Sequence, residues 1–203
     1  MGKLFVISGR SNTGKDTIYK ELLKRMQDLN SIVTYTTRLP RVGEREGIEY
    51  HFITNSKLED LRQKGKVIEC RTYDTVTGPL SYCTIDDGQI NLDKGNCLVI
   101  GTLEQFEQLY KYFGKENVVD IYIEVCDEVV LTRYMERERK QPNPNYKEIC
   151  RRFLDDYKEF NEENLARLGI LKRFNNEGSL EKVVEEIVNY IRKEGGCYEE
   201  KIS

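Results

Sequence analysis

The chain lacks the features of membrane, secreted and zinc-binding proteins. No stretch approaches the roughly 20 apolar residues that a membrane-spanning helix needs, and the start, MGKLFVISG, is too short for a secretory signal and lacks its cleavage pattern. A single histidine, His51, and the absence of any CxxC pair leave no ligand set for zinc. We therefore expect a cytoplasmic protein. Its cysteines are expected to be reduced thiols, mostly in buried packing, at positions 70, 83, 97, 126, 150 and 197.

A strong charge of one sign and internal repeats are also missing. The 203 residues carry a net charge of −3, with 32 Lys and Arg and 35 Asp and Glu spread along the chain. This balance argues against a nucleic-acid partner, and no membrane partner is expected. With 38% hydrophobic residues, the chain is predicted to fold as one domain, 1–203, that buries roughly 70% of its unfolded surface. Its oligomeric state stays open.

Short apolar runs alternate with helical patterns along the chain. Runs of strand length are LFVI at 4–7, CLVI at 97–100 and VVDIYIEV at 118–125. The first helix is expected to present one apolar face, and so is the last, which follows the N-cap candidate Ser179. The residues of these faces are Ile18, Leu22, Leu23 and Met26, then Leu180, Val183, Val184, Ile187, Val188 and Ile191. The alternation predicts an α/β fold, a parallel sheet flanked by helices.

Two segments depart from that alternation. Residues 33–93 are rich in Thr, Tyr and Val with turn residues between them, which predicts a small lobe of short, mixed strands. Residues 127–165 hold two charged helices, at 127–140 and from 146 to about 165, and the prolines of KQPNPN interrupt the helix between them. We expect this helical hairpin to be a lid. The core then consists of residues 1–32, 94–126 and 166–195.

The loop after the first strand has the pattern of a phosphate site. Gly9, Gly14 and Lys15 follow a strand and precede an amphipathic helix, which is the context in which such glycines bind phosphate. Backbone N–H groups and the helix N-terminus attract the anion, and Lys15 reaches the outer phosphates. The predicted ATP-binding residues of this P-loop are Gly9, Arg10, Ser11, Asn12, Thr13, Gly14, Lys15, Asp16 and Thr17.

Asp16 departs from the usual pattern, which has Ser or Thr directly after the lysine. Thr17 offers a hydroxyl one residue later, and Asp16 can accept hydrogen bonds from the waters that Mg²⁺ keeps. A negative charge near phosphate also lowers the affinity for metal-free nucleotide. Asp16 is therefore expected to change how the metal is held without abolishing nucleotide binding.

A second anion site is predicted in the segment TTRLPRVGEREGIEY. Arg38 and Arg41 lie in a turn-rich stretch, and Tyr50 follows a few residues later. Two guanidinium groups near a phenol suit a phosphomonoester, because Arg pairs bidentately with phosphate oxygens. On charge alone, however, a solvated basic loop is the favoured interpretation.

A longer pattern changes that balance. Residues 34–52, TYTTRLPRVGEREGIEYHF, resemble the GMP-binding segment of the guanylate kinase family, with Thr34 in place of the first Ser. The resemblance runs, with gaps, over nearly the whole chain. It implies an NMP-binding lobe at 33–93, a lid at 127–165, and an enzyme that transfers a phosphoryl group from ATP to GMP or dGMP with Mg²⁺ as cofactor. The implied partners are the small-molecule nucleotides ATP and GMP.

The resemblance also implies roles for single residues. Thr34 and Glu69 would face the guanine, and Asn175 would lie near the adenine of ATP. The acceptor phosphate would bind Arg38, Arg41, Tyr50 and Tyr82. The implied catalytic residues, around the phosphoryl group in transfer, are Lys15, Arg133, Arg137 and Arg152.

The chain departs from the family near the base. Where the family has a strand reading LDID, this chain reads LVIGT, so Ile100 and Thr102 stand at two usual aspartate positions. One of those aspartates helps to read the guanine amino group. Thr102 is expected to accept one hydrogen bond in its place and to discriminate less well, by about 1–3 kcal/mol. Around Tyr82, SYCT replaces the family's YYGT.

Two other functions stay open. The GKD sequence, the missing strand aspartates and NNEGSL at 175–180 also resemble ribose 1,5-bisphosphate phosphokinases, which generally lack the TTRxPRxGExxGxxY stretch. A phosphopeptide-binding scaffold is the third interpretation, because some guanylate-kinase-like domains keep the acceptor site without catalysis. Those scaffolds typically degrade the P-loop, whereas Gly9, Gly14 and Lys15 are present here.

Overall fold

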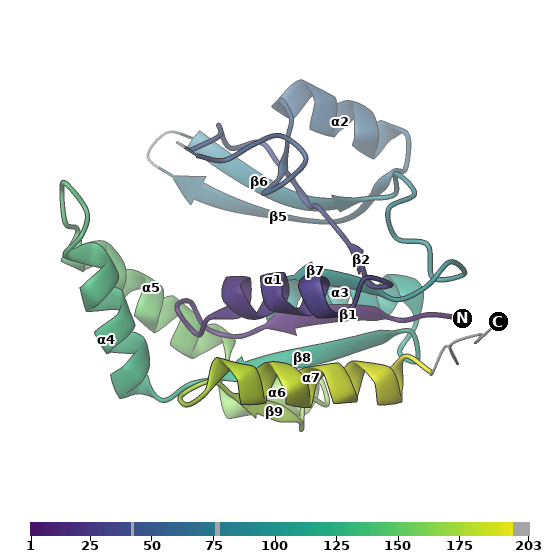
Figure 1. Ribbon diagram of the computed structural model, residues 1–203. Coiled ribbons are helices and arrows are strands. Elements are labelled where there is room, and N and C mark those ends of the chain that lie inside the picture. The colour runs from purple at the N-terminus through teal and green to yellow at the C-terminus, as the bar shows by residue number, and fades with distance from the viewer. Residues whose placement is uncertain (42, 76–77, 197–203) are drawn as a thin grey trace.

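Two sheets and a helical arm make up the computed structural model, which describes residues 1–41, 43–75 and 78–196 (Figure 1). Val42, in the arginine-rich segment, and Cys197 lie outside the described residues. In Figure 1 the larger sheet lies below the smaller one, and the arm stands at the left end of the larger sheet.

The larger sheet is parallel. Its strands are β1 (Leu4–Ser8), β2 (Asn30–Ser31), β7 (Cys97–Ile100), β8 (Val118–Glu124) and β9 (Arg173–Asn175), in the order β2-β7-β1-β8-β9. The three predicted apolar runs form its three central strands, which confirms them. The edge strands β2 and β9 were not predicted, because two or three residues are too few to form a recognisable apolar run.

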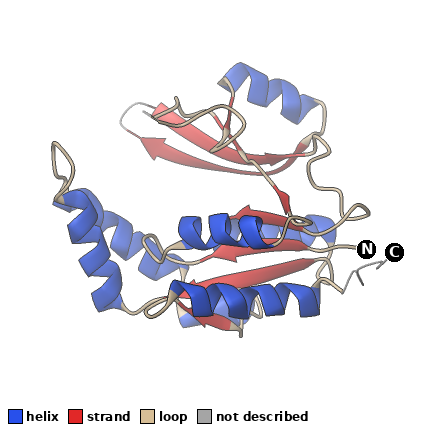
Figure 2. Cartoon of the chain, viewed as in Figure 1, coloured by secondary structure: helices blue, strands red, loops and turns tan. Residues whose placement is uncertain are grey.

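Helices cover both faces of this sheet (Figure 2). On one face, α1 (Lys15–Arg25) and α7 (Leu180–Glu194) bury Ile18, Leu22, Ile187 and their neighbours against the strands. On the other, α3 (Leu103–Phe113) and α6 (Glu162–Arg167) form a second core. The predicted α/β fold class is therefore confirmed. None of the helices in the described ranges combines the length and apolar character that a bilayer crossing requires.

One carboxyl group lies inside the second core. Asp120, in β8, is 9% exposed; its Oδ2 accepts a hydrogen bond from Ser8 Oγ at 3.0 Å, and its Oδ1 has no partner within the described part of the chain. Burial raises the pKa of Asp120 to about 8, and the Ser8 hydrogen bond offsets only part of that rise. The folded protein therefore keeps a proton on Asp120 that the unfolded chain releases at neutral pH.

Because Asp120 is protonated in the folded protein, we expect its substitution to change the stability. Because folding raises the pKa of Asp120, the protonated carboxyl favours the folded state at low pH. This contribution to the free energy of unfolding is lost as pH rises toward 8. We expect Asp120→Asn, a neutral isostere, to stabilise the protein at pH 8 by about 1–3 kcal/mol, which raises Tm by roughly 2–4 °C per kcal/mol. Thermal melts should show the gain shrinking toward pH 4. The exposed Asp93→Asn is the control, and an equal gain at both pH values would contradict the prediction.

The smaller sheet is mixed. Its strands are β3 (Tyr35–Thr36), β4 (His51–Phe52), β5 (Val67–Thr75) and β6 (Gly78–Ile85), in the order β4-β3-β6-β5. The pair β3–β4 is parallel and the other pairs are antiparallel, as expected for 33–93. A helix that the sequence analysis missed, α2 (Asn55–Gln63), packs Leu58 against this sheet. Its start has a local signal, because the Thr54 side chain accepts from Lys57 N.

Two cysteines of the smaller sheet are paired. Cys70 on β5 and Cys83 on β6 stand directly opposite each other and form a disulfide, with 4.1 Å between their Cα atoms. The prediction of reduced thiols is wrong for this pair, because the antiparallel register brings together residues 13 apart in the chain. Cys97 is free and buried, whereas Cys126 and Cys150 are free and exposed. Buried packing is thus also wrong for Cys126 and Cys150.

The helical arm consists of α4 (Asp127–Glu138) and α5 (Tyr146–Glu159). Val130 and Tyr134 on α4 pack on Ile149 of α5, which holds the pair together. The prediction of one helix from 146 to about 165 is wrong. Helix α5 ends at Glu159. A separate helix, α6, begins after Asn161, whose side chain caps it by accepting a hydrogen bond from Asn164 N.

Candidate active site

The loop between β1 and α1 has the conformation of a phosphate cradle. Gly9, Asn12 and Gly14 have positive φ angles of 141°, 62° and 92°. A Cβ at Gly9 would lie 2.5 Å from the carbonyl oxygen of Ile123, so glycine is required there. Gly14 is the N-cap residue of α1, which places the partial positive charge of the helix N-terminus at the loop. The loop is therefore built to hold an anion at the carboxyl edge of the larger sheet.

Lys15, the first residue of α1, folds back across this loop. Its Nζ donates hydrogen bonds to the carbonyl oxygens of Gly9 and Arg10, the latter at 2.7 Å. Burial lowers the pKa of Lys15 to about 8, although nearby carboxylates, chiefly Asp156, counteract part of that effect. Lys15 is thus a desolvated cation that backbone oxygens hold at the loop.

The lowered pKa predicts a pH-dependent nucleotide affinity. Below about pH 8 Lys15 is protonated, and above it phosphate binding must first restore the proton. We expect the Kd for ADP, measured by calorimetry, to be flat near neutral pH and to rise by up to about tenfold per pH unit above pH 8. Lys15→Arg is the matched control, because a guanidinium stays protonated throughout. An equally steep rise in that variant would assign the effect to another group.

Two other loop residues shape the cradle. The guanidinium of Arg10 points away from it and donates to Asp127 and to the carbonyl oxygen of Val125. Thr13 is buried, and its Oγ1 donates to the Arg10 carbonyl at 2.8 Å. The structure therefore does not bring the Arg10 side chain to the predicted ATP site.

A carboxylate from the arm already contacts one of the loop donors. Ser11 N donates to Oδ2 of Asp156, on α5, at 2.6 Å. Because a carboxylate oxygen and a phosphate oxygen are both anionic acceptors, this contact shows that the Ser11 N–H is directed at an anion. A nucleotide phosphate at this position would displace Asp156. Neither Asp156 nor its neighbour Glu159, whose pKa burial raises, was singled out from the sequence.

Asp16 and Thr17 lie on the exposed first turn of α1. Asp16 lines the same cavity as Arg38 and Arg41, so its carboxylate faces the second predicted anion site. Among the described residues, no group of three or more His, Cys, Asp or Glu side chains is arranged as a metal cage. An ion there would depend on water and phosphate oxygens, which is how Mg²⁺ is usually held.

The second anion site is built around Arg38. Its guanidinium pairs bidentately with Glu44, at 2.9 and 3.0 Å, and its Nε donates to the Tyr82 hydroxyl at 3.2 Å. It also lies 5.5 Å from the centre of the Tyr50 ring, within cation–π range. Arg41 is exposed, and its backbone N–H donates to Glu44. Arg38 is thus held in place, and the Arg41 guanidinium lies at the cavity wall.

The two predicted anion sites adjoin. A cavity of about 200 Å³ is lined by Lys15, Arg71 and Asp156, and a second, of about 590 Å³, by Arg38, Arg41 and Asp16. Both cavities share the same wall residues, which are Thr34, Tyr50, Tyr82 and Ile100. The lysine of the loop and the arginines of the second site therefore face adjoining cavities.

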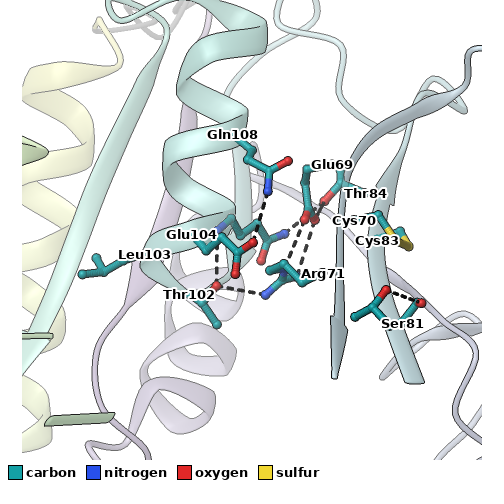
Figure 3. Close-up of polar contacts among 12 residues, drawn as sticks. Glu69, Cys70, Arg71, Ser81, Cys83, Thr84, Thr102, Leu103, Glu104 and Gln108 are labelled. Carbon is teal, nitrogen blue, oxygen red and sulfur yellow. Dashed lines mark hydrogen bonds and ion pairs between the residues drawn. A yellow bond between two sulfur atoms is a disulfide. The ribbon is translucent and has the colours of Figure 1, made fainter. Parts of the chain in front are cut away.

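Two of the predicted base-reading residues, Glu69 and Thr102, belong to one polar network (Figure 3), and the third, Thr34, lines both cavities. Glu69 pairs with Arg71, which donates from Nε to Glu69 Oε2 at 3.0 Å and from Nη1 to Thr102 Oγ1 at 3.0 Å. Glu69 also accepts from Thr84 Oγ1 at 2.6 Å. The Glu69 side chain is fully buried and does not line the 200 Å³ cavity, whereas Arg71 and Thr102 do. The structure thus places Arg71, rather than Glu69, at the cavity wall.

In this arrangement the Thr102 oxygen already accepts two hydrogen bonds from the protein. Thr102 is the N-cap residue of α3, and its Oγ1 accepts from Gln105 N at 3.2 Å as well as from Arg71. A hydroxyl has two acceptor lone pairs, and both are used. What Thr102 has left is its own O–H, which is a donor.

The three predicted lid arginines occupy different positions. Arg133 donates to the backbone carbonyls of Asn12 and Asn176, at 3.2 and 2.8 Å, and so reaches the P-loop. Arg137 contacts Asn12 Oδ1 at 3.4 Å, and Arg152 is exposed and pairs with Glu148. Arg137 and Arg152 also line a cavity of about 640 Å³ together with Arg41. The arm thus directs its arginines toward both predicted anion sites.

Asn175 is not at the P-loop. It is exposed, and its Oδ1 accepts from Glu177 N at 2.9 Å. The next residue, Asn176, is buried instead, and its Nδ2 donates to the Thr13 carbonyl at 2.7 Å. Alternation along β9 is the signal that indicates this, because Phe174 and Asn176 both point inward.

The comparison with known families settles the relationship. The guanylate kinase family model matches residues 1–149, well over half of the chain. The chain belongs to the guanylate kinase family. A guanylate kinase of Clostridioides difficile (strain 630) is 45% identical over 78 residues, so the match spans only 38% of each protein's length. One from Wolbachia sp. subsp. Brugia malayi is 28% identical over 202 residues, which cover 95% of this chain and 93% of that relative.

A solved structure agrees with the family fold. The crystal structure of guanylate kinase from Anaplasma phagocytophilum matches with a TM-score of 0.66 over 97% of this chain and 88% of the other, at 22% identity. At that identity the likeness shows the fold alone. Two residues that depart from the family's sequence pattern, Asp16 and Thr102, line the two cavities of this site.

Proposed function

We propose that this protein transfers the γ-phosphoryl group of ATP to a nucleoside monophosphate, with GMP and dGMP as the acceptors that family membership suggests. The observation that carries the proposal is the shared wall of Thr34, Tyr50 and Tyr82 between the cavity of Lys15 and that of Arg38 and Arg41. A donor phosphate on the loop and an acceptor phosphate on the arginines would lie in adjoining cavities. In-line transfer requires that proximity.

The reaction requires the protein mainly to position the two phosphate groups and to neutralise their charge. The acceptor phosphate is ionised at neutral pH, so no general base is needed to activate it. The P-loop N–H groups and Lys15 would bind the donor phosphates, and Arg38, Arg41, Tyr50 and Tyr82 the acceptor phosphate. Arg38, already fixed by Glu44, would present its guanidinium without reorganising.

The residues present fit a water-mediated Mg²⁺. The exposed Asp16 carboxylate lies one residue from Lys15 and faces the acceptor cavity, where it can accept hydrogen bonds from metal-bound water. When bound, the ion would neutralise charge on the phosphate oxygens. Asp16 is therefore the residue we propose to hold it.

Each of the three structural parts has its own role in this proposal. We propose that residues 33–93 bind the acceptor, that the core carries the P-loop, and that the arm at 127–165 is a lid. Arg133 already contacts the P-loop, and Arg137 and Arg152 share a cavity with Arg41. Closure of the arm would bring these guanidinium groups over the transferring phosphoryl group and exclude the water that would otherwise hydrolyse ATP.

A coupled ADP-release assay with Mg-ATP tests the proposal. The acceptors are GMP, dGMP, AMP, IMP and ribose 1,5-bisphosphate, and we expect turnover with nucleoside monophosphates. Turnover with ribose 1,5-bisphosphate alone would replace the proposal with a sugar phosphate kinase. No turnover with any phosphorylated acceptor would favour the phosphopeptide-binding scaffold.

A further inference from the structure

The cavity beside Lys15 presents a cation where a base edge would bind. Arg71 lies on β5 and is 7% exposed; its guanidinium pairs with the buried Glu69 (Figure 3), and Arg71, unlike Glu69, lines the cavity. Two of its contacts go to Glu69, from Nε at 3.0 Å and from Nη2 at 3.4 Å, and one goes to Thr102. A guanidinium has five N–H donors; these contacts use three and Tyr73 accepts from a fourth, so one N–H stays free for a ligand.

The carboxylate behind Arg71 has little capacity left. Glu69 Oε1 accepts from Thr84 Oγ1 and from Arg71 Nη2, and Oε2 accepts from Arg71 Nε. Of the roughly four lone-pair directions of a carboxylate, three are in use. An N–H edge of a base would therefore have to break the buried Glu69–Arg71 pair in order to reach both oxygens, and breaking a buried pair is costly.

Besides the carboxylates of Asp156 and Glu159, which accept from Ser11 N and Leu103 N, the polar groups next to Arg71 are Thr102 and Gln105. Thr102 keeps only its O–H, because its oxygen accepts from Arg71 and Gln105 N. Gln105 donates from Nε2 to Thr84, and its Oε1 lies 2.8 Å from the point that a Cβ on Gly101 would occupy, at the cavity wall. The carboxylates of Asp156 and Glu159 also line the cavity, and both act on Lys15.

The hydrogen-bonding groups around Arg71 suit one kind of base edge. Guanine offers two neighbouring N–H donors and one carbonyl, so it needs two acceptors side by side. An imide edge, which is a ring N–H flanked by two carbonyls, needs one acceptor between donors. The remaining N–H of Arg71 and the Thr102 O–H supply donors, and the side-chain carbonyl of Gln105 is an acceptor.

We propose that Arg71 is a specificity-determining residue that makes this site prefer an acceptor nucleotide with an imide edge, as in xanthine or uracil, over guanine. The inference rests on the proposed kinase function and deepens it. An amino group placed against the Arg71 guanidinium would leave two buried donors facing each other, whereas a carbonyl there accepts a charge-assisted hydrogen bond.

Three purine nucleotides probe this contact, because the 2-position carries hydrogen in IMP, an amino group in GMP and a carbonyl in XMP, which also bears a hydrogen on N3. We expect kcat/KM of the wild-type protein with Mg-ATP to be at least about tenfold higher for XMP than for GMP, with IMP between them. Arg71→Met should shift the XMP-to-GMP ratio at least about tenfold toward GMP. The control is Arg62→Met, which removes a guanidinium from the outside of the same lobe, near Cys70, and should leave the ratio unchanged.

A further assay with UMP distinguishes a pyrimidine acceptor from a purine acceptor. UMP turned over faster than XMP would place a pyrimidine in the site, and the reverse would place a purine; either result supports the proposal. The wild-type ratio needs no variant, and Arg71→Lys keeps the buried charge if Arg71→Met does not fold. GMP preferred over XMP by the wild type, or an unmoved ratio in Arg71→Met, would overturn the assignment of Arg71 and leave the kinase function standing. No turnover with any nucleotide would instead overturn the kinase function itself.

Discussion

Lys15→Ala is expected to lower kcat by at least about 100- to 1,000-fold while the protein stays folded. The loop that holds Lys15 is shaped by Gly9 and Gly14, whose positive φ angles do not depend on the lysine. The hydrogen bonds that the Lys15 side chain makes go to backbone oxygens, and its neighbour Asp156 keeps the hydrogen bond from Ser11 N when the lysine is removed. Single-turnover kinetics with saturating Mg-ATP, together with a thermal melt, measure the two effects separately.

The matched control for this variant is Lys24→Ala. Lys24 lies on the same helix, is 69% exposed and pairs with Glu21, so its loss should leave kcat within about twofold. A Lys15→Ala protein that melts normally and keeps most of its activity would remove Lys15 from the catalytic residues. A melt lowered by many degrees would instead show that the lysine maintains the loop.

Arg41→Ala is expected to raise the KM for the acceptor nucleotide by about 10- to 100-fold and to leave the KM for ATP nearly unchanged. A hydrogen bond to a charged group contributes about 1.5–3 kcal/mol, which corresponds to that range. Arg41 is exposed and lines the acceptor cavity, and its contacts with Glu44 are made by its backbone N–H and carbonyl, which the substitution keeps. Steady-state kinetics with each substrate varied in turn would separate the two KM values.

Arg45→Ala provides the comparison for Arg41, because Arg45 is an exposed arginine in the same loop whose backbone N–H contacts Glu49. Loss of either arginine lowers the positive charge of the loop equally. If both variants change the acceptor KM to the same extent, the loop attracts nucleotides only by its general charge. A change confined to Arg41 would assign it to the phosphate.

Local patterns were informative where a motif occupies consecutive residues. The P-loop could be read from Gly9, Gly14 and Lys15, because a single turn brings them together and their conformation follows from the glycines. The central strands were equally clear, since LFVI, CLVI and VVDIYIEV are buried on both sides. The short strands β2 and β9 and the helix α2 were missed, because their apolar content is too small to indicate burial.

Contacts between segments far apart in the chain could not be predicted from local sequence patterns. Cys70 and Cys83 bond because an antiparallel register sets them opposite, and Asn176 rather than Asn175 meets the P-loop because of alternation in a short strand. The contact of Asp156 with Ser11 joins residues 145 positions apart. No sequence spacing indicates such a contact.

The amino-acid sequence by itself determined the parallel α/β core, the P-loop and the arginine segment, because each depends on short-range spacing and on hydrophobic periodicity. Only the tertiary structure decided which polar groups face the cavity. Glu69 is withdrawn behind Arg71, and Thr102 has both lone pairs filled, because strand β5 and the start of α3 meet there. The free hydrogen-bonding capacity of a buried group depends on all its neighbours at once, and those neighbours come from segments that the chain keeps far apart.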